Sequence, residues 1–400
     1  MFESLSTLPA DPILGLNQEF QQDENPNKIN LSIGVYQDES GQTPIFSAVK
    51  KAEQKLIDLQ STKSYAPQIG DPAFVKLSTE LLLGSELVKA RNDEIATVMT
   101  PGGCGALRMG GELINSARPG AKVWVSTPTW ANHFPLLESA GLNLVHYSYY
   151  DTKANKIDFA AMMASLEAAQ EGDVVLLHGC CHNPTGADIS PQEWDAVIDL
   201  LQRKNLLPFI DVAYQGFGHG LDADAYGVRQ AVSKLPEVLI SSSCSKNFGL
   251  YRERTGSLIM VTEAQPSTVA ARSHVLAAAR RSYSMSPYHG GGIVGVLLSD
   301  PDLTREWKHE LDQVRQHMHA LRNSLAEGLN QAQDVMNFDF VSDSNGMFCF
   351  LGIPREMVLE LRSQYGIYLL ESTRMNIAGL SDQNLPVIIE RVSGLLKKSH

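Results

Sequence analysis

Long apolar runs, cysteine and an excess of basic charge are all scarce or absent in this sequence. A helix that spans a bilayer needs about 20 consecutive apolar residues, and no run here approaches that length, so we expect no membrane association. Lys and Arg number 33 against 45 Asp and Glu, and the resulting net charge of −12 argues against a nucleic-acid partner. The first residues lack the basic start and apolar core of a signal peptide, which predicts a cytoplasmic protein.

The 400 residues include five cysteines, whose spacing matches neither a disulfide scaffold nor a zinc site. The nearest thing to a metal motif is His178-GCCH, in which Cys180 stands beside Cys181. Neighbouring side chains on a strand point to opposite faces, so this pair is not expected to share an ion. We therefore predict buried structural thiols and no metal site.

The middle of the sequence alternates short β-rich runs with amphipathic stretches such as residues 191–204. The runs cover residues 94–101, 121–128, 172–182, 207–215, 237–246 and 256–263. Near-continuous apolar strands that alternate with helices predict an α/β fold, with a mainly parallel sheet covered on both faces. Ligands of such sheets bind beyond the carboxyl ends of the strands.

The pattern changes near residue 302, where a long helical period begins that is clearest over 305–329. The segments that follow are two strand candidates, a mixed run and a closing helix: 338–342, 346–352, 366–380 and the C-terminal residues. We predict a large domain of residues 45–305. A smaller α+β domain would combine residues 1–44 with residues 306–400.

Four polar clusters lie where predicted strands end, at residues 101–108, 182–186, 211–215 and 243–254. The first is glycine-rich and stands between a strand and a helix, where it is either an anion site or a plain tight turn. The second, His182-NPTG, is predicted to be a turn, whether or not it also carries a functional residue. In the third, a buried Asp211 needs a partner, which a protonated pyridine nitrogen or a structural hydrogen bond would provide.

The fourth cluster places Lys246 at the end of an apolar strand. Such a lysine is either an exposed cap or an amine in a partly dry site, where desolvation lowers its pKa and makes it a nucleophile for carbonyls. Ser243, Ser245 and Arg254 can together hold a phosphate, with Arg254 as the forked donor.

In combination, Asn183-PTG, Asp211-VAY and Ser243-C-Ser245-Lys246, with Arg254 eight residues after the lysine, resemble the class I aminotransferases of pyridoxal 5'-phosphate (PLP) fold type I. The resemblance covers essentially the whole chain and is closest to the aspartate and aromatic aminotransferase subgroup. It implies a large PLP-binding domain built on a mainly parallel seven-stranded sheet.

The resemblance also implies roles for individual residues. Lys246 would hold PLP as a Schiff base and then move the substrate proton, while Asp211 would pair with the pyridine nitrogen. Tyr214 and Asn183 would hydrogen-bond the phenolic oxygen of the ring, and Trp130 would stack on the ring. The residues expected at the phosphate are Gly103, Cys104, Ser243, Ser245 and Arg254.

Substrate residues follow from the same resemblance. Arg374 would bind the α-carboxylate through a bidentate fork, and Gly34 lies in a segment that closes over the substrate. Arg280 would reach the side-chain carboxylate from the neighbouring subunit, and Tyr65 would cross the same interface to the phosphate. Trp130 and Asn183 also line the substrate site. A site shared in this way implies a homodimer.

Arg281 is an alternative to Arg280 for the contact across the interface. Adjacent helical positions point about 100° apart, so only one of the two arginines is expected to make it. Cys104 departs from the family, whose members usually carry a hydroxyl residue there. A thiol is a weaker donor, but it ionises more readily at a helix N-terminus unless a phosphate opposes it.

Two arginines placed for two carboxylates favour a dicarboxylic substrate. The resemblance therefore implies ping-pong transamination of aspartate with 2-oxoglutarate to oxaloacetate and glutamate. The alternative is an aromatic amino acid aminotransferase with secondary aspartate activity, because Gly186-AD and Gly216-FGHGLDADAY are similar to the aromatic branch.

Two other classes of function compete with an aminotransferase. A PLP decarboxylase or lyase would have little use for the second arginine. A binding module without catalysis would not need Lys246, Asp211 and Tyr214 together.

Overall fold

The computed structural model describes residues 2–8 and 12–398. The chain divides into a larger unit, Pro44–His317 with Ser344–Gly346, and a smaller unit, Met1–Thr43 with Met318–Asp343 and Met347–His400. No helix among the described residues is both long and apolar enough to cross a bilayer.

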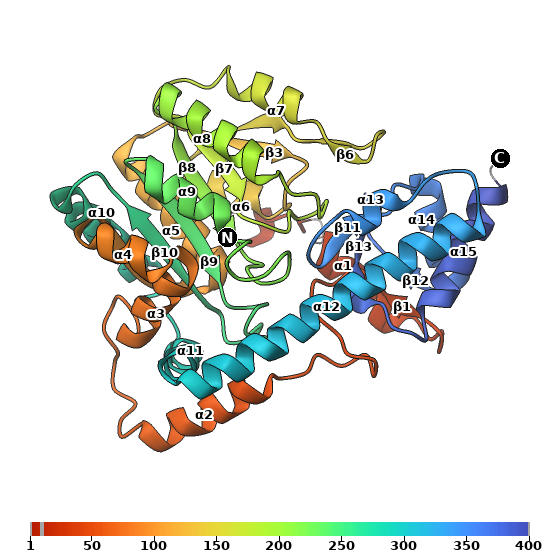
Figure 1. The fold of residues 1–400 in the computed structure, drawn as a ribbon, viewed down its shortest axis with the longest axis horizontal. Coiled ribbons are helices and arrows are strands. Elements are labelled where there is room, and N and C mark those ends of the chain that lie inside the picture. The colour runs from red at the N-terminus through yellow and green to blue at the C-terminus, as the bar shows by residue number, and fades with distance from the viewer. Residues whose placement is uncertain (1, 9–11, 399–400) are drawn as a thin grey trace. The chain divides into compact units, whose positions relative to one another are not determined.

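The larger unit contains a seven-stranded sheet with the order β2-β10-β9-β8-β7-β3-β4 (Figure 1). The strands are β2 Ile95–Pro101, β3 Lys122–Thr127, β4 Asn143–Ser148, β7 Val174–His178, β8 Leu207–Val212, β9 Val238–Ser243 and β10 Thr255–Val261. Only β10 runs antiparallel to its neighbours, β2 and β9. The predicted α/β fold with a mainly parallel seven-stranded sheet is therefore confirmed. Six of its strands correspond to the predicted runs, and the seventh is the edge strand β4.

Helices cover the sheet, with α8 and α9 on the side nearer the viewer in Figure 1 and α5 behind it. The helices of this unit are α2 Ser47–Leu59, α3 Pro72–Leu83, α4 Ser85–Ala90, η2 Asn92–Glu94, α5 Gly102–Ala117, α6 His133–Glu138, α7 Phe159–Leu166, α8 Pro191–Lys204, α9 Tyr226–Lys234, α10 Gln265–Ser282 and α11 Tyr288–Ser299. A small hairpin adds β5 Tyr150–Asp151 and β6 Lys156–Ile157. The predicted amphipathic helix at 191–204 is confirmed as α8. It begins after a capping box formed by Ser190 and Glu193, and it ends at Asn205, whose backbone is left-handed.

The core of the larger unit holds α5 close to the sheet. Leu107 and Met109 of α5 pack with Phe209 of β8 and Leu258 of β10 in one buried cluster. A Cβ atom on Gly110 would lie 2.4 Å from Cζ of Phe209, so glycine is required for the helix to approach this closely. This packing fixes the first turn of α5 beside the carboxyl ends of the parallel strands.

The long helix α12, Pro301–Ala332, begins in the larger unit and ends in the smaller one. The sequence prediction placed the domain boundary at 305/306, whereas the units divide at 317/318, inside this helix. Trp307 explains the difference, because its indole N–H donates to the carbonyl of Asn247 at 2.8 Å and its ring stacks on Phe248. The first part of α12 therefore belongs to the larger unit.

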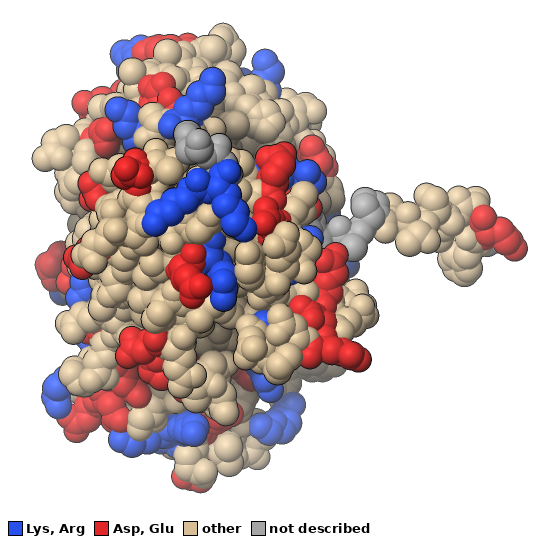
Figure 2. Space-filling model, turned by 90° about the vertical axis from the view of Figure 1, so that its right-hand side faces the viewer, with Lys and Arg blue, Asp and Glu red and all other residues tan. Residues whose placement is uncertain are grey.

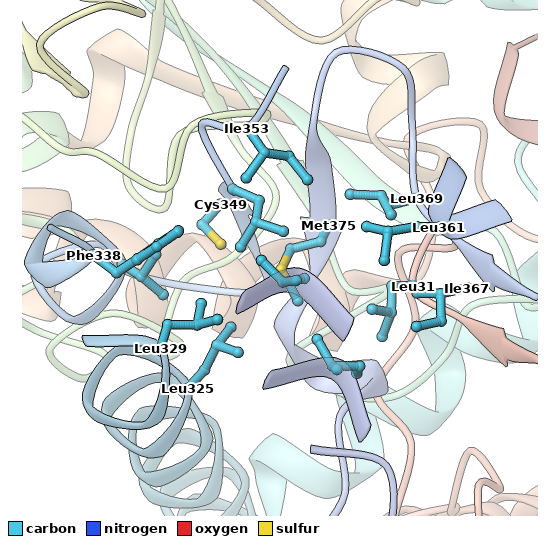
Figure 3. Packing of buried hydrophobic residues seen from close by; sticks show 14 of the residues in the cluster. Leu31, Leu325, Leu329, Phe338, Cys349, Ile353, Leu361, Ile367, Leu369 and Met375 are labelled. Atoms are coloured by element: carbon cyan, nitrogen blue, oxygen red, sulfur yellow. The ribbon is translucent and has the colours of Figure 1, made fainter. Parts of the chain in front are cut away.

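The smaller unit is built around an apolar cluster that includes Leu325, Leu329, Met375 and Leu31 (Figure 3). Its elements are η1 Phe2–Ser4, α1 Pro12–Gln22, β1 Ile29–Asn30, α13 Asp339–Ser342, β11 Phe348–Phe350, α14 Arg355–Tyr365, β12 Ile367–Tyr368, β13 Arg374–Asn376, η3 Ile377–Gly379 and α15 Leu385–Lys398. Strand β1 pairs parallel with β12, and β11 pairs antiparallel with β13. The segment from Ile29 is thus tied to a strand near the other end of the chain.

The predicted strand at 338–342 is wrong, because Asp339–Ser342 form the short helix α13 and Phe338 is its N-cap residue. Phe338 and Val341 are both fully buried, and a spacing of three places them on the same side of a helical turn. Asn330 stabilises the start of this turn by accepting a hydrogen bond from the N–H of Phe338 at 2.8 Å. Helical spacing and this side-chain acceptor outweigh the strand propensity of the aromatic residues.

Charges of both signs are mixed on the surface. Figure 2 shows Lys and Arg side chains lying among Asp and Glu side chains on the face that it draws. In the larger unit, Lys51 lies 2.7 Å from Glu306 and Lys55 lies 2.9 Å from Asp300. This mixture differs from the basic stripe that is typical of nucleic-acid-binding domains.

Candidate active site

Lys246 lies just beyond the carboxyl end of β9, with its ammonium nitrogen 4.9 Å from the centre of the Tyr214 ring. Burial lowers the pKa of this amine, and Arg254 lowers it further, while the negative charge of Asp211 opposes both. A lowered pKa increases the fraction of neutral amine, which is the nucleophilic form. Lys246 is therefore an amine in a partly dry site and not an exposed cap.

Asp211 belongs to β8, and its side chain is 8% exposed. Burial works to raise the pKa of this carboxyl, but a hydrogen bond from His133 and the neighbouring His133 and His178 rings outweigh it. The pKa therefore lies below its ordinary value. A hydrogen bond from Ser241 acts in the same direction. A buried carboxylate that stays charged can stabilise a cationic group of a ligand.

A chain of side chains leads to Asp211 from β7. His178 Nε2 lies 3.0 Å from Thr129 Oγ1, which lies 2.8 Å from His133 Nδ1, and His133 Nε2 lies 3.3 Å from Asp211 Oδ2. At the end of this chain, His133 donates from Nε2 to the Asp211 carboxylate. Burial lowers the pKa of His178 to about 3, which keeps that ring neutral. Trp130 stands edge-on to His133, with 5.3 Å between ring centres.

The first turn of α5 lies close to Arg254, and together they form a group of hydrogen-bond donors, here called the donor site. Helix α5 begins at Gly102 directly after Pro101, whose side chain cannot cap it, so its first N–H groups are left for a ligand. A Cβ atom on Gly102 would lie 2.7 Å from Nη2 of Arg254, and one on Gly103 would lie 3.3 Å from Cβ of Ser243. Glycines therefore let the helix end approach these side chains.

Arg254 is held in place by its own loop. Its Nη1 donates to the carbonyl of Tyr251 at 2.9 Å and to Oγ of Ser245 at 3.4 Å. Ser243 accepts a hydrogen bond from the N–H of Ser245 at 3.3 Å. The hydroxyl groups, the guanidinium and the helix end together present donors suited to a phosphate dianion.

Cys104 lies in the first turn of α5 and accepts a weak contact from Asn132 Nδ2 at 3.9 Å. Burial raises the pKa of its thiol, and the charge of Asp211 adds to this, whereas Arg254 and Lys246 act in the opposite direction. The net direction is upward, so the helix end and its cations do not ionise this cysteine. Cys104 is a neutral thiol beside the donor site.

Asn183 and Tyr214 are both buried, with 6% and 5% of their surface exposed. The turn that carries Asn183 is anchored by the preceding His182, whose Nε2 lies 3.1 Å from Ser126 Oγ and whose Nδ1 lies 2.9 Å from Thr185 Oγ1. This anchoring places Asn183 beyond the end of β7, as expected from the sequence pattern.

Cys180 and Cys181 do not show the strand alternation that the sequence pattern predicts. Strand β7 ends at His178, so neither cysteine lies on it, and Cys181 has a left-handed φ of +51°. The two sulfurs and a carboxylate oxygen of Asp224 lie within 4.8 Å of one another, and all three residues are buried. The alternation rule failed because the strand stops before the pair.

Two residues expected at a subunit interface lie on the surface of the larger unit. Tyr65 is 92% exposed. Arg280, near the end of α10, is exposed and donates to Ser284 Oγ at 2.6 Å, and its neighbour Arg281 is exposed as well. Within one chain, neither Tyr65 nor Arg280 belongs to the buried group around Lys246.

In the smaller unit, Arg374 of β13 is 3% exposed and forms the centre of a packed cluster. Its Nη2 donates to the carbonyl of Ser32 at 2.7 Å, and the Phe348 ring covers its guanidinium at 4.3 Å. A Cβ atom on Gly34 would lie 2.6 Å from Cζ of Phe348. Asn376 donates to the carbonyls on either side of Gly34 at 2.7 and 2.8 Å. The segment around Gly34 is thus bound to the strand that carries Arg374.

Sequence reasoning missed His133 and Thr129. The signal was present in Pro128-TWANH, where a threonine and a histidine stand four residues apart and a turn before α6 brings their side chains together. Their partner, Asp211, is distant in the sequence, and only the order of the strands brings it within reach.

Comparison with known proteins identifies the family. The family described as "Aminotransferase class I and II" matches residues 26–392. The aspartate aminotransferase of Escherichia coli (strain K12) is 42% identical over 396 residues, which are 99% of this chain and 100% of that one. The aromatic-amino-acid aminotransferase of Paracoccus denitrificans is 43% identical over 392 residues, 98% of this chain and 99% of that one.

A solved structure agrees with these relatives. The aromatic-amino-acid aminotransferase from Burkholderia pseudomallei, covalently bound to pyridoxal phosphate, superposes with a TM-score of 0.96 at 38% identity, over 99% of both chains. This chain therefore belongs to the class I and II aminotransferases, within the aspartate and aromatic subgroup. It is a PLP-dependent aminotransferase that acts on amino acids and 2-oxo acids.

Proposed function

We propose that this aminotransferase transfers the amino group of aspartate to 2-oxoglutarate and produces oxaloacetate and glutamate by a ping-pong mechanism. The observation that carries the proposal is the pairing of an amine of lowered pKa, Lys246, with a carboxyl of lowered pKa, Asp211, at one edge of the sheet. That pairing suits amine exchange on a cofactor whose ring nitrogen is cationic.

The chemistry of the donor set fits PLP. When bound, PLP supplies a carbonyl carbon for exchange with amines and a ring that accepts electrons from the substrate. Asp211 would pair with the ring nitrogen and keep it protonated, while Tyr214 and Asn183 would donate to the phenolic oxygen. The phosphate is held by the first turn of α5 at Gly103 and Cys104, and by Ser243, Ser245 and Arg254. Trp130 covers the ring face.

Lys246 has two tasks in this proposal. Its lowered pKa favours the neutral amine, the form that would bond to the cofactor's carbonyl carbon. The same nitrogen, when free, would act as the general base that removes the proton from the substrate α-carbon. Burial excludes water from this proton transfer and increases its selectivity.

Arg374 binds the substrate α-carboxylate as a bidentate donor. Its packing under Phe348 and its bond to the Ser32 carbonyl support this role, because both hold the guanidinium in one orientation. Gly34 lies in the segment that covers the substrate, and Trp130 and Asn183 line the substrate site. The second carboxylate is bound by Arg280 of a second copy of the chain.

The proposed assembly is a homodimer with shared active sites, to which Tyr65 and Arg280 are each contributed across the interface. The exposure of both side chains supports this assignment, because an exposed tyrosine and arginine suit a contact with another subunit.

The test mixes Lys246→Ala chains with Arg280→Ala chains. Random pairing should restore about a quarter of the sites, because half of the dimers are mixed and each mixed dimer holds one intact site. Mixtures no more active than either parent would contradict the shared site.

The choice of substrate is tested by kinetics. With 2-oxoglutarate as acceptor, kcat/KM for aspartate should exceed that for phenylalanine, because Arg280 pairs with a carboxylate and leaves its charge unpaired against a phenyl ring. A higher kcat/KM for phenylalanine would favour the second candidate, an aromatic amino acid aminotransferase with secondary aspartate activity. The almost equal identity to relatives of both names supports keeping this candidate.

A further inference from the structure

The buried group of Cys180, Cys181 and Asp224, here called the thiol pair with its carboxylate, has no task in the transamination chemistry. Its three ligand atoms lie within 4.8 Å of one another, and the two thiols are in hydrogen-bonding contact. Cys180 is 6% exposed and Cys181 is 3% exposed. Such a pair of sulfurs can be bridged by a single atom.

A disulfide fits this pair poorly. Disulfide-bonded residues usually have Cα atoms about 4.4–6.8 Å apart. Cys180 and Cys181 are adjacent and joined by a trans peptide bond, which separates their Cα atoms by about 3.8 Å. An S–S bond would therefore require distortion of a buried backbone.

A zinc ion also fits poorly. Structural zinc sites are closed by four ligands, and only three groups converge here among the described residues. Asp224 is already engaged, because its carboxylate accepts hydrogen bonds from the N–H groups of Gly216, Gly218 and His219 at 2.8, 3.0 and 2.7 Å. Two thiolates and a carboxylate around one divalent ion would also leave a net negative charge in a buried site.

We propose that Cys180 and Cys181 form a binding site for a neutral trivalent arsenical, and that its occupancy stops the neighbouring aminotransferase site. Trivalent arsenic is soft, bonds to sulfur and takes three ligands, which matches two thiols and one remaining hydroxyl. The remaining As–OH group donates a hydrogen bond to Asp224, whose carboxylate has about four acceptor positions and uses three of them for backbone N–H groups. The bound species carries no net charge, so the site gains no charge that burial would penalise.

The reaction is a ligand exchange without oxidation or reduction. Arsenious acid, As(OH)3, reacts with two thiols to give (RS)2AsOH and two molecules of water. Two As–S bonds form and two As–O bonds break, and each thiol proton leaves with a departing hydroxide. No external base or oxidant is required, and arsenic remains trivalent throughout.

The position of the pair explains why binding affects the active site. Cys181 directly precedes the turn that carries Asn183, and its sulfur lies 4.0 Å from the carbonyl of Tyr214. The N–H of Cys181 donates to Asp188 at 2.8 Å, and a Cβ atom on Gly346 would lie 2.4 Å from Cβ of Cys181. An added arsenic atom has little free space there, so we expect it to move the backbone that presents Asn183 and Tyr214.

The binding test uses the PLP-loaded enzyme and sodium arsenite, with intact-mass spectrometry as the readout. We expect one arsenic per chain, no adduct in Cys180→Ser or Cys181→Ser, and an unchanged adduct in the matched control Cys349→Ser, a single buried thiol of the smaller unit. The absence of an adduct on the parent enzyme, or its persistence in either serine variant of the pair, would overturn the proposal.

A second measurement needs no variant and therefore does not depend on how the serine proteins fold. After arsenite treatment, the enzyme is denatured in the presence of iodoacetamide and mapped by peptide mass. We expect Cys180 and Cys181 to be protected together, with Cys104, Cys244 and Cys349 alkylated. Protection of any other cysteine in place of the pair refutes the assignment.

The inhibitory half of the proposal has its own readout. Transaminase activity should fall in proportion to the adduct and return on addition of a dithiol such as 2,3-dimercaptopropanol. It should also survive arsenite in the Cys181→Ser enzyme. An enzyme that carries the adduct and retains full activity would disprove the coupling to the active site, whatever its amino acid substrate.

Discussion

Asp211 and Asp224, two buried carboxylates of the larger unit, have pKa values shifted in opposite directions. Their exposed fractions are nevertheless similar, at 8% and 5%. Burial is the largest influence on both and works to raise the pKa of each. The pKa of Asp211 nevertheless lies below its ordinary value, and that of Asp224 lies above it. Enclosure alone therefore does not decide whether a carboxyl group in this protein is charged.

The neighbours make the difference. Asp211 has two imidazole rings beside it. Asp224 has one, that of His219, accepts from three backbone N–H groups and lies near another carboxyl, Asp188. Burial raises the pKa of Asp188 to about 6, and the charge of Asp224 adds to this. The charged carboxylate of Asp211 suits a cationic ligand. Asp224 instead holds the turn at residues 216–219 through its three backbone hydrogen bonds.

The difference between Asp211 and Asp224 is tested most strongly by replacing each carboxylate with an amide in turn. Asp211→Asn should lower kcat by roughly 10²–10⁴-fold, because removing one partner of a buried ion pair costs about 3–5 kcal/mol. Asp224→Asn should leave kcat within a few-fold of the parent and lower the free energy of unfolding by about 1–3 kcal/mol, the cost of an unsatisfied buried donor. Steady-state kinetics and urea unfolding measure both. Equal losses of kcat would show that the two acids are not distinguished by their neighbours.

Removing the imidazole beside Asp211 should have a smaller effect. His133→Ala deletes a hydrogen bond to a charged group, worth about 1.5–3 kcal/mol, and should lower kcat by roughly 10–100-fold. Burial is then less opposed, so the pKa of Asp211 rises and the acidic limb of the kcat profile should move to higher pH. The matched control is His289→Ala, since His289 also contacts a carboxylate, Glu53, but at a half-exposed position. An unchanged pH profile in His133→Ala would contradict the assignment.

Asp188 predicts a pH effect on stability. Its folded-state pKa of about 6 lies above the ordinary 3.8, so the folded protein binds this proton more tightly than the unfolded chain does. The resulting stabilisation is fully present below pH 3.8 and is lost as the pH rises to about 6, on the order of 3 kcal/mol in total. Asp188→Asn should flatten the pH dependence of urea unfolding between these limits. A profile that matches the parent would show that this group does not titrate there.

The smallest effect is expected at Cys104, whose thiol is influenced by the charge of Asp211. Since the thiol is neutral and a weak donor, Cys104→Ser supplies a better hydrogen-bond donor to the phosphate at similar volume. The serine variant should retain PLP at least as well as the parent during dialysis, measured by visible absorbance. Faster loss of cofactor from the variant would show that the thiol contributes more than its donor strength.

Much of the site could be predicted from the sequence, because its residues follow strands in parallel order. Lys246 and Asp211 each stand towards the end of an apolar run, and the carboxyl ends of parallel strands meet at one edge. Arg254 directly precedes β10, which runs antiparallel and therefore begins at that same edge. Strand β4 was missed because it is an edge strand in which only Tyr147 is buried, so its residues show no continuous apolar run.

The parts that were wrong depend on where an element stops. Cys180 and Cys181 were treated as strand residues, but the strand ends at His178 and a left-handed turn brings the two sulfurs together. The domain boundary was placed near the start of α12, whereas Trp307 ties the first part of that helix to the larger unit. Such endpoints are set by tertiary contacts, which sequence periodicity does not record.

Within the seven-stranded sheet, the antiparallel strand β10 has a consequence for how the larger unit folds. Strands β9 and β10 are neighbours in both sequence and sheet, so the loop between them, which carries Lys246 and Arg254, closes by a short-range contact. Short loops close at a low entropic cost, whereas the parallel pairs must wait for long crossovers. We therefore expect Lys246 and Arg254, the proposed anchors of the cofactor's aldehyde carbon and phosphate, to reach their mutual spacing early in folding, before the more distant strands have paired.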